Sequence, residues 1–202
     1  MTWRYLLYCL REPRYSLCRL HLRTSDFLHR REPWISHEAV VFCASLLNSS
    51  QVGLEWGSGR STPWYGKRLG KLLSIEFDPV WHRKVVRATR DLPGVECRLI
   101  PLEHSLNEPT VRDYDPVPAY VAVANEFRDE SLDFVVVDGH YRLACVKQVL
   151  PKIKAGGLLL IDNTDWLPLP EWGIPASWRI VHQSSALTQT TVWLKPKVSN
   201  VT

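Results

Sequence analysis

Two acidic residues end two short apolar runs of this chain, and a glycine turn follows the first of them. The first run begins at Val52 and ends at Glu55, and the second begins near Leu72 and ends at Glu76. Between the runs lie a turn and a helix start, with Gly57, Ser58, Gly59, Ser61 and Thr62. A strand, a Gly-x-Gly turn, a helix and a second strand that ends in a carboxylate form half of a doubly wound nucleotide-binding sheet. We therefore predict that Glu76 accepts hydrogen bonds from ribose hydroxyls, in a ligand built on adenosine.

The residues around the turn discriminate between adenosine ligands. A nicotinamide site prefers a third glycine where this chain has Thr62, because helix and strand pack tightly beside the pyrophosphate. The Gly-Lys-Ser/Thr ending of a phosphate-binding loop is absent from this segment. Glu55 stands two residues before the first glycine, where a carboxylate would repel a pyrophosphate but suits an ammonium or sulfonium group. The sequence therefore favours a cationic adenosyl cofactor.

The string Glu-Trp-Gly-Ser-Gly-Arg-Ser-Thr from Glu55 to Thr62, with Glu76, Phe77 and Trp81 after it, resembles the class I S-adenosylmethionine-dependent methyltransferases. It is similar in particular to a bacterial-type subgroup that methylates small molecules. The resemblance covers about residues 33–195 and implies S-adenosylmethionine as the cofactor. It also implies a Rossmann-like α/β fold whose mostly parallel seven-stranded sheet ends in an antiparallel hairpin.

The resemblance also assigns roles to individual residues. Glu55 would lie near the amino group of the cofactor or beneath the turn. Glu76 would bind the ribose, Phe77 would lie against the adenine, and Asp138 would face both cofactor and acceptor. The methionine portion would be held through the backbone and hydroxyl groups of Gly57, Ser58, Gly59, Ser61 and Thr62.

Start and end signals place the other elements. Ser36 is suited to cap a helix, and Pro79 is suited to begin one. The expected helices cover residues 37–47, 79–89, 119–127 and 141–153, and the expected strands cover 95–100, 132–137 and 158–161, the last after a glycine turn. Residues 178–182 and 190–194 predict two further strands joined by a short polar loop. A parallel pair needs a longer crossover, so these two strands must be antiparallel.

The predicted strand ends gather the candidate catalytic residues. Ligands of open α/β sheets bind beyond the carboxyl ends of the strands, where Asp138 and His140 follow one strand and Asp162 and Asn163 follow another. His140 titrates near neutral pH and is a candidate general base, with Asp138 facing the acceptor. Tyr141 and Arg142 are candidate contacts for an anionic group of the acceptor, although Arg142 is equally suited to cap a helix face.

A metal site is an alternative use of the same strand ends. Asp138, Asp162 and Asn163 resemble the magnesium ligands of the catechol O-methyltransferase group. Oxygen ligands suit a hard divalent ion, which would lower the pKa of acceptor hydroxyls. Because the lysine that this group carries after the acid is absent, we do not predict a metal ligand set.

Composition limits the remaining classes. The 202 residues carry a net charge of +4 without dense Lys/Arg clusters, so nucleic acid is not the predicted acceptor. Five scattered cysteines and the absence of a long apolar run predict a cytoplasmic protein without a membrane span. Trp34 and Trp56 are candidates to face a ligand pocket.

Residues 1–32 are expected to form a basic helical extension, and residues 33–202 the cofactor-binding domain. The predicted function is transfer of a methyl group to an oxygen or nitrogen of a small molecule or short peptide. A nicotinamide-dependent oxidoreductase and a non-catalytic protein with the same fold remain alternatives. A homodimer is left open.

Overall fold

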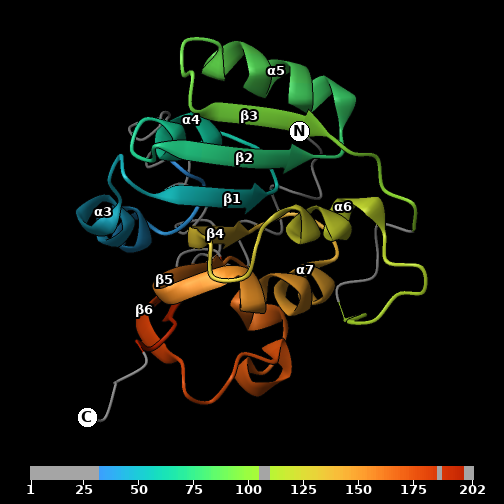
Figure 1. Cartoon of the computed structure of the whole chain (residues 1–202). Helices are drawn as coiled ribbons and strands as arrows, with labels where there is room; N and C mark the ends of the chain where they lie inside the picture. The colour runs from blue at the N-terminus through green and yellow to red at the C-terminus, as the bar shows by residue number, and fades with distance from the viewer. Residues whose placement is uncertain (1–31, 105–109, 186–187, 198–202) are drawn as a thin grey trace, which may run out of the picture. The chain divides into compact units, whose positions relative to one another are not determined.

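Seven strands of the described residues form one sheet in the order β3-β2-β1-β4-β5-β7-β6 (Figure 1). The computed structural model describes residues 32–104, 110–185 and 188–197. The strands are β1 (Val52–Trp56), β2 (Lys71–Glu76), β3 (Val95–Leu99), β4 (Leu132–Val137), β5 (Ile153–Ile161), β6 (Arg179–Ser185) and β7 (Gln189–Leu194). Strands β1 to β5 pair in parallel, whereas β7 pairs antiparallel with β5 and with β6. The predicted doubly wound sheet with a terminal antiparallel hairpin is confirmed.

Helical segments connect the parallel strands, as parallel pairing requires. The helices are α3 (His37–Leu46), α4 (Ser61–Gly66), α5 (Pro79–Thr89), α6 (Ala119–Ala122) and α7 (Arg142–Val149). Single 3-10 turns are η1 (Val123–Glu126), η2 (Leu150–Lys152), η3 (Thr164–Trp166) and η4 (Leu169–Trp172). Ser36 caps α3 as predicted, because its Oγ accepts the N–H of Ala39 at 3.2 Å. Asp78 caps α5 through the N–H groups of Val80 and Trp81, both at 2.7 Å.

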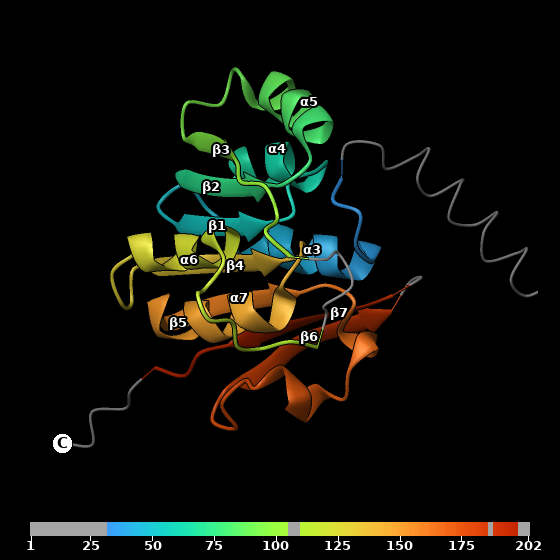
Figure 2. The ribbon, with the colours of Figure 1, turned by 90° about the vertical axis from the view of Figure 1, so that its right-hand side faces the viewer.

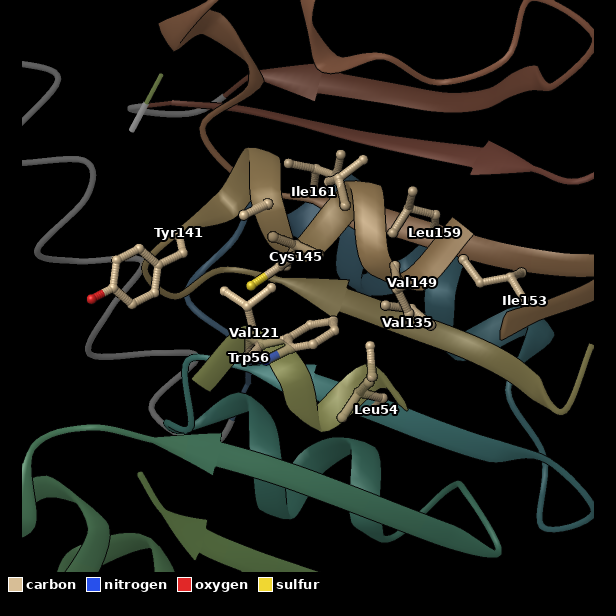
Figure 3. Close-up of a cluster of buried hydrophobic side chains, with 14 of the residues drawn as sticks. Leu54, Trp56, Val121, Val135, Tyr141, Cys145, Val149, Ile153, Leu159 and Ile161 are labelled. Carbon is tan, nitrogen blue, oxygen red and sulfur yellow. The ribbon is translucent and has the colours of Figure 1, made fainter. Parts of the chain in front are cut away.

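The sheet has a separate hydrophobic core on each face. On β4, Val135 packs in the core that contains residues of α6 and α7, whereas Phe134 and Val136 pack in the core that contains residues of α3 and α4. Figure 2 shows these two helical layers, and Figure 3 shows the first core, with Val149 of α7 beside Val135. Successive strand residues point to opposite faces, so the continuous apolar run of β4 fills both cores.

The structure differs from the expectation at β5. The sequence predicts a helix as far as Ile153 and a glycine turn before Leu158, but α7 ends at Val149 and β5 already begins at Ile153. Pro151 lies in the 3-10 turn η2, since its missing N–H disfavours further α-helix. Gly156 has a φ of +83° and lies where the pairing register between β4 and β5 shifts. The glycines therefore form a bulge inside a strand.

The described residues from Pro33 onward belong to one compact unit, which spans residues 33–202. The predicted helical extension of residues 1–32 lies, except for Glu32, outside the described residues. No helix of the described segments is long and apolar enough to cross a membrane. Their cysteines, Cys43, Cys97 and Cys145, are free thiols.

Candidate active site

The carboxyl ends of β1, β2 and β4 lie at one edge of the sheet. The candidate cofactor and catalytic residues at the ends of these strands lie at this edge. Gly57 lies so close to the end of β4 that a Cβ on it would stand 2.5 Å from the carbonyl oxygen of Asp138. Its φ of +94° also favours glycine. The rings of Phe77 and His140 meet edge to face, with centroids 4.5 Å apart. Three strand ends therefore contribute to a single site.

Glu55 is fully buried and binds the glycine turn through hydroxyl groups. Its Oε1 accepts a hydrogen bond from Ser61 at 2.5 Å, and its Oε2 accepts from Thr62 at 2.7 Å and from Ser74 at 2.6 Å. Ser58 extends this network, with its Oγ 2.6 Å from the Oγ of Ser74. Burial raises the pKa of Glu55, and the three hydroxyl donors oppose that rise. Of the two expected placements of Glu55, the structure has the one beneath the turn.

The backbone N–H groups of the turn are also used within the protein. Gly57 and Ser58 donate to the carbonyl of Ile75 at 3.0 and 3.2 Å. Gly59 donates to Oγ1 of Thr62 at 2.9 Å. An anionic ligand would need free N–H groups of this kind, and these three are engaged. The turn therefore offers a pyrophosphate no free N–H from these three residues.

The hydroxyl groups expected to hold a cofactor point into the same internal network. Thr62 is fully buried and Ser58 is only 4% exposed. Ser61 is half-buried and donates to Glu55. Contacts of these residues with a cofactor stay predictions, and as placed their hydroxyls fix the shape of the turn.

Glu76 is held by one carboxylate oxygen and leaves the other without a partner among the described residues. Its Oε1 accepts the backbone N–H groups of Phe77 at 2.9 Å and of Asp78 at 2.8 Å. The side chain is almost buried, and this burial raises the pKa of Glu76, while the two N–H donors lower it. The arrangement orients a carboxylate at the end of β2 and leaves Oε2 able to accept a hydrogen bond from a ligand.

Arg142 joins the ends of β4 and β5. Its Nε donates to the carbonyl of Gly139 at 2.9 Å, and its Nη2 donates to the carboxylate of Asp138 at 3.0 Å. Its Nη1 donates to the backbone carbonyl of Asp162. The guanidinium also lies 4.5 Å from the ring centroid of Trp166 and is 6% exposed. These donors hold the strand ends and favour a structural role for Arg142, and its contact with an anionic acceptor stays a prediction.

The two candidate catalytic groups at the end of β4 have pKa values shifted in opposite directions. Burial raises the pKa of Asp138, and the neighbouring Arg142 opposes the rise. Burial lowers the pKa of His140, and Arg142 lowers it further. The imidazole of His140 is therefore neutral at pH 7 and able to accept a proton.

Asp138 and Asp162 each bind a protein group through a carboxylate oxygen that a metal ion would need. Oδ1 of Asp138 is paired with Arg142, and Oδ1 of Asp162 accepts from Thr190 at 2.5 Å. Across the described ranges no group of three or more His, Cys, Asp and Glu side chains could hold a metal ion. Independence from a metal ion stays a prediction, to be tested with EDTA.

The two tryptophans proposed for the pocket differ in their surroundings, and the role of Trp34 stays a prediction. Trp56 is fully buried and donates its Nε1 hydrogen to the carbonyl of Tyr120 at 2.8 Å, so its assignment to a ligand pocket is wrong. Helix α6 covers the face of β1 on which Trp56 lies. The alternation of side chains along a strand does not reveal which face a helix covers. Trp34 is 72% exposed, and Arg60 lies 5.4 Å from its ring centroid.

Sequence reasoning missed two contacts, that of Ser74 with Glu55 and that of Trp81 with the glycine turn. Ser74 pairs in register with Glu55 across β1 and β2, so a polar residue in an otherwise apolar strand was the available signal. Trp81 donates its Nε1 hydrogen to the carbonyl of Ser58 at 2.7 Å. No feature of the sequence indicates this contact, because it joins α5 to the glycine turn.

Comparisons with known proteins identify the fold. No protein-family model matches the sequence, and no curated protein matches it. Among solved structures, a methyltransferase from Geobacter sulfurreducens matches with a TM-score of 0.59 at 10% identity, over 98% of each chain. An rRNA methylase from Streptococcus thermophilus matches with a TM-score of 0.58 at 14% identity, over 80% of this chain and 95% of the other.

A third structure resembles this chain and holds a ligand. It is the candidate methyltransferase SMU.1697c from Streptococcus mutans in complex with SAH, with a TM-score of 0.53 at 11% identity, over 77% of this chain and 94% of the other. At these identities the likeness shows a common fold, the Rossmann-like fold of these methyltransferases.

Proposed function

We propose that this protein is an S-adenosylmethionine-dependent methyltransferase that acts on an oxygen or nitrogen atom of a small molecule or short peptide. The observation that carries the proposal is the inward direction of the N–H groups of Gly57, Ser58 and Gly59. A turn whose donors are engaged does not suit a pyrophosphate but does suit the ammonium and sulfonium groups of this cofactor. The methyltransferase fold supports the same conclusion.

The binding residues divide between the two halves of the cofactor. Glu76 would accept the ribose hydroxyls, with Oε2 open to a ligand and Oε1 fixed by backbone donors. Phe77 would lie against the adenine. The methionine portion would contact the turn at Gly57 and Gly59, whose shape Glu55 maintains from beneath. Asp138, at the end of β4, would face the cofactor and the acceptor.

The chemistry asks little of the protein beyond alignment and proton removal. S-Adenosylmethionine supplies an activated methyl group: the acceptor lone pair bonds to the methyl carbon while the carbon–sulfur bond breaks, and SAH leaves. An acceptor O–H or N–H must lose its proton in the process. His140 is the proposed base, because its lowered pKa keeps it neutral at pH 7, and Asp138 would orient the acceptor.

Two alternatives remain for the test. A nicotinamide oxidoreductase would need a pyrophosphate site, and Thr62 with the engaged N–H groups disfavours one. A non-catalytic protein would have no reason to keep both Glu55 and Glu76 in hydrogen-bonded positions.

Calorimetric titration of the full chain with SAH and with NAD separates these functions. We expect SAH to bind and NAD not to bind. Glu76→Ala should weaken SAH binding by about 1.5–3 kcal/mol, because a charge-assisted contact is lost, while circular dichroism stays unchanged. Glu96→Gln is the matched control, since Glu96 is an exposed acid of β3 paired with Arg98 at 2.7 Å. Binding of NAD in place of SAH, or full SAH affinity in Glu76→Ala, would refute the proposal.

A further inference from the structure

Trp81 connects the two segments to which the proposed function assigns the cofactor. It lies in the first turn of α5, just after Glu76, and its Nε1 hydrogen bond reaches the carbonyl of Ser58 at 2.7 Å. Ser58 stands between the two glycines of the turn on β1. The contact therefore joins the residues after β2 to the turn after β1 by a route other than the sheet.

The tryptophan is itself held from two sides. Its backbone N–H donates to the carboxylate of Asp78 at 2.7 Å. Lys84, one turn further along α5, places its Nζ 4.6 Å from the centroid of the Trp81 ring. The ring is nevertheless 40% exposed, so burial alone does not explain its position. A fixed, partly exposed indole that donates to a loop carbonyl is suited to hold that loop.

The side chain and the N–H of Ser58 and the N–H of Gly59 bind other parts of the fold, and the indole of Trp81 binds the carbonyl of Ser58. The N–H of Ser58 shares the Ile75 carbonyl with Gly57 and is the longer of the two bonds, at 3.2 Å against 3.0 Å. Glycines on both sides leave the backbone of this segment more conformational freedom than other residues would. The indole bond fixes the carbonyl end of the Ser58–Gly59 peptide, whose N–H end donates to Thr62.

We propose that Trp81 is a positioning residue that holds the glycine turn at a fixed position relative to Glu76. Both halves of one adenosyl cofactor can then bind at the same time. The inference rests on the proposed function, because it assigns the turn and Glu76 to the same ligand. Trp81 acts through Ser58 and need not touch the cofactor.

Two measurements on the full chain test this role. Trp81→Phe keeps an aromatic ring but removes the N–H donor. We expect it to weaken SAH binding about two- to tenfold, the effect of one hydrogen bond, and to speed hydrogen exchange of the peptide that contains residues 57–62. Trp172→Phe is the matched control, because it also removes an indole N–H that donates to a backbone carbonyl, that of Thr164 at 3.2 Å, away from the glycine turn and β2, and it should change neither quantity.

Each result decides the proposal. Weaker SAH binding with faster exchange in Trp81→Phe alone supports it. Unchanged SAH affinity overturns it, and so does weaker binding with unchanged exchange, which would make Trp81 a direct cofactor contact. The same effects in Trp172→Phe would also overturn it. If the wild-type chain does not bind SAH, the proposed function fails, and exchange at residues 57–62 alone shows whether Trp81 holds the turn.

Discussion

The guanidinium of Arg142 donates to the backbone carbonyl of Asp162, so a residue that follows β4 holds the end of β5. The same side chain donates to the carboxylate of Asp138 and the carbonyl of Gly139. Beyond the last β4/β5 pair, Val137 and Ile161, the strand ends share one backbone bond, from the N–H of Asp162 to the carbonyl of Val137 at 3.2 Å. Arg142 supplies further donors there, and its charge offsets that of the half-buried Asp138 carboxylate.

Removing this guanidinium should be costly. Arg142→Met leaves Asp138 without its ion pair and removes the donor from three backbone carbonyls, and we expect the free energy of unfolding to fall by about 3–5 kcal/mol. Denaturant unfolding measures the change. Arg98→Met is the control, because the ion pairs of Arg98 with Glu96 and Glu126 lie at the surface and should cost about 1 kcal/mol or less. An equal loss in the two variants would show that Arg142 does not hold the strand ends.

Glu55 should make stability depend on pH. Burial raises its folded-state pKa above the ordinary 4.5, so the folded chain binds this proton more tightly than the unfolded chain. The contribution of Glu55 to the free energy of unfolding therefore falls as pH rises from the ordinary value to the folded one, and is constant above both. Glu55→Gln lacks this dependence.

The check is denaturant unfolding of the wild type and Glu55→Gln across that pH range. The wild type should lose stability relative to the variant as pH rises. Because burial also raises the pKa of Glu76, the comparison is made between these two proteins, which share that group. A wild type that gains stability relative to Glu55→Gln would mean that the three hydroxyl donors outweigh burial.

Gly139 should tolerate no side chain. A Cβ on it would stand 2.1 Å from the hydroxyl oxygen of Tyr120 and 2.9 Å from the backbone nitrogen of Gly57. We expect Gly139→Ala to destabilise the fold by about 1–3 kcal/mol, as overpacking does. Adding Tyr120→Phe removes the nearest atom and should restore part of the loss, which thermal unfolding of the three variants would reveal. No recovery in the double variant would assign the strain to the Gly57 contact.

Metal removal should leave cofactor binding unchanged. Arg142 already lies at Oδ1 of Asp138, and Thr190 already donates to Oδ1 of Asp162, so a divalent cation would have to displace both contacts. We expect equal SAH affinity and equal melting temperature in EDTA and in excess Mg²⁺. Once an acceptor is known, turnover is measured under the same two conditions. Activity lost in EDTA and restored by Mg²⁺ would contradict this expectation.

The sequence predicts the elements of this fold better than the contacts between them. The β4 strand, the helix cap at Ser36 and the helix start at Pro79 depend on local residues, and the hairpin follows from the short link between its strands. The bulge at Gly156 was missed because a positive-φ glycine inside a strand and one in a turn look alike in a sequence.

The candidate site was predictable as a set of strand ends but not as a network. Glu55, Glu76 and Asp138 lie at the predicted edge because parallel strands end together. The inward use of the N–H groups of Gly57 and Ser58 was hidden, because their acceptor, Ile75, belongs to a neighbouring strand. The part played by Arg142 was hidden for the same reason, since it binds carbonyl groups, which every residue carries.

Strand β7 follows β1 to β6 in the chain and is synthesised after them, and this order affects the sheet edge near Asp162. Thr190 donates to the carboxylate of Asp162, which precedes it by 28 residues, and Gln189 donates its N–H to Asp165. A growing chain that already contains the glycine turn and both acids still has β5 as an open edge strand, which is prone to pair with other chains. The edge near Asp162 is completed only when residues 189–194 have left the ribosome. Premature termination before that point would leave a chain with all its proposed cofactor contacts but an unprotected sheet.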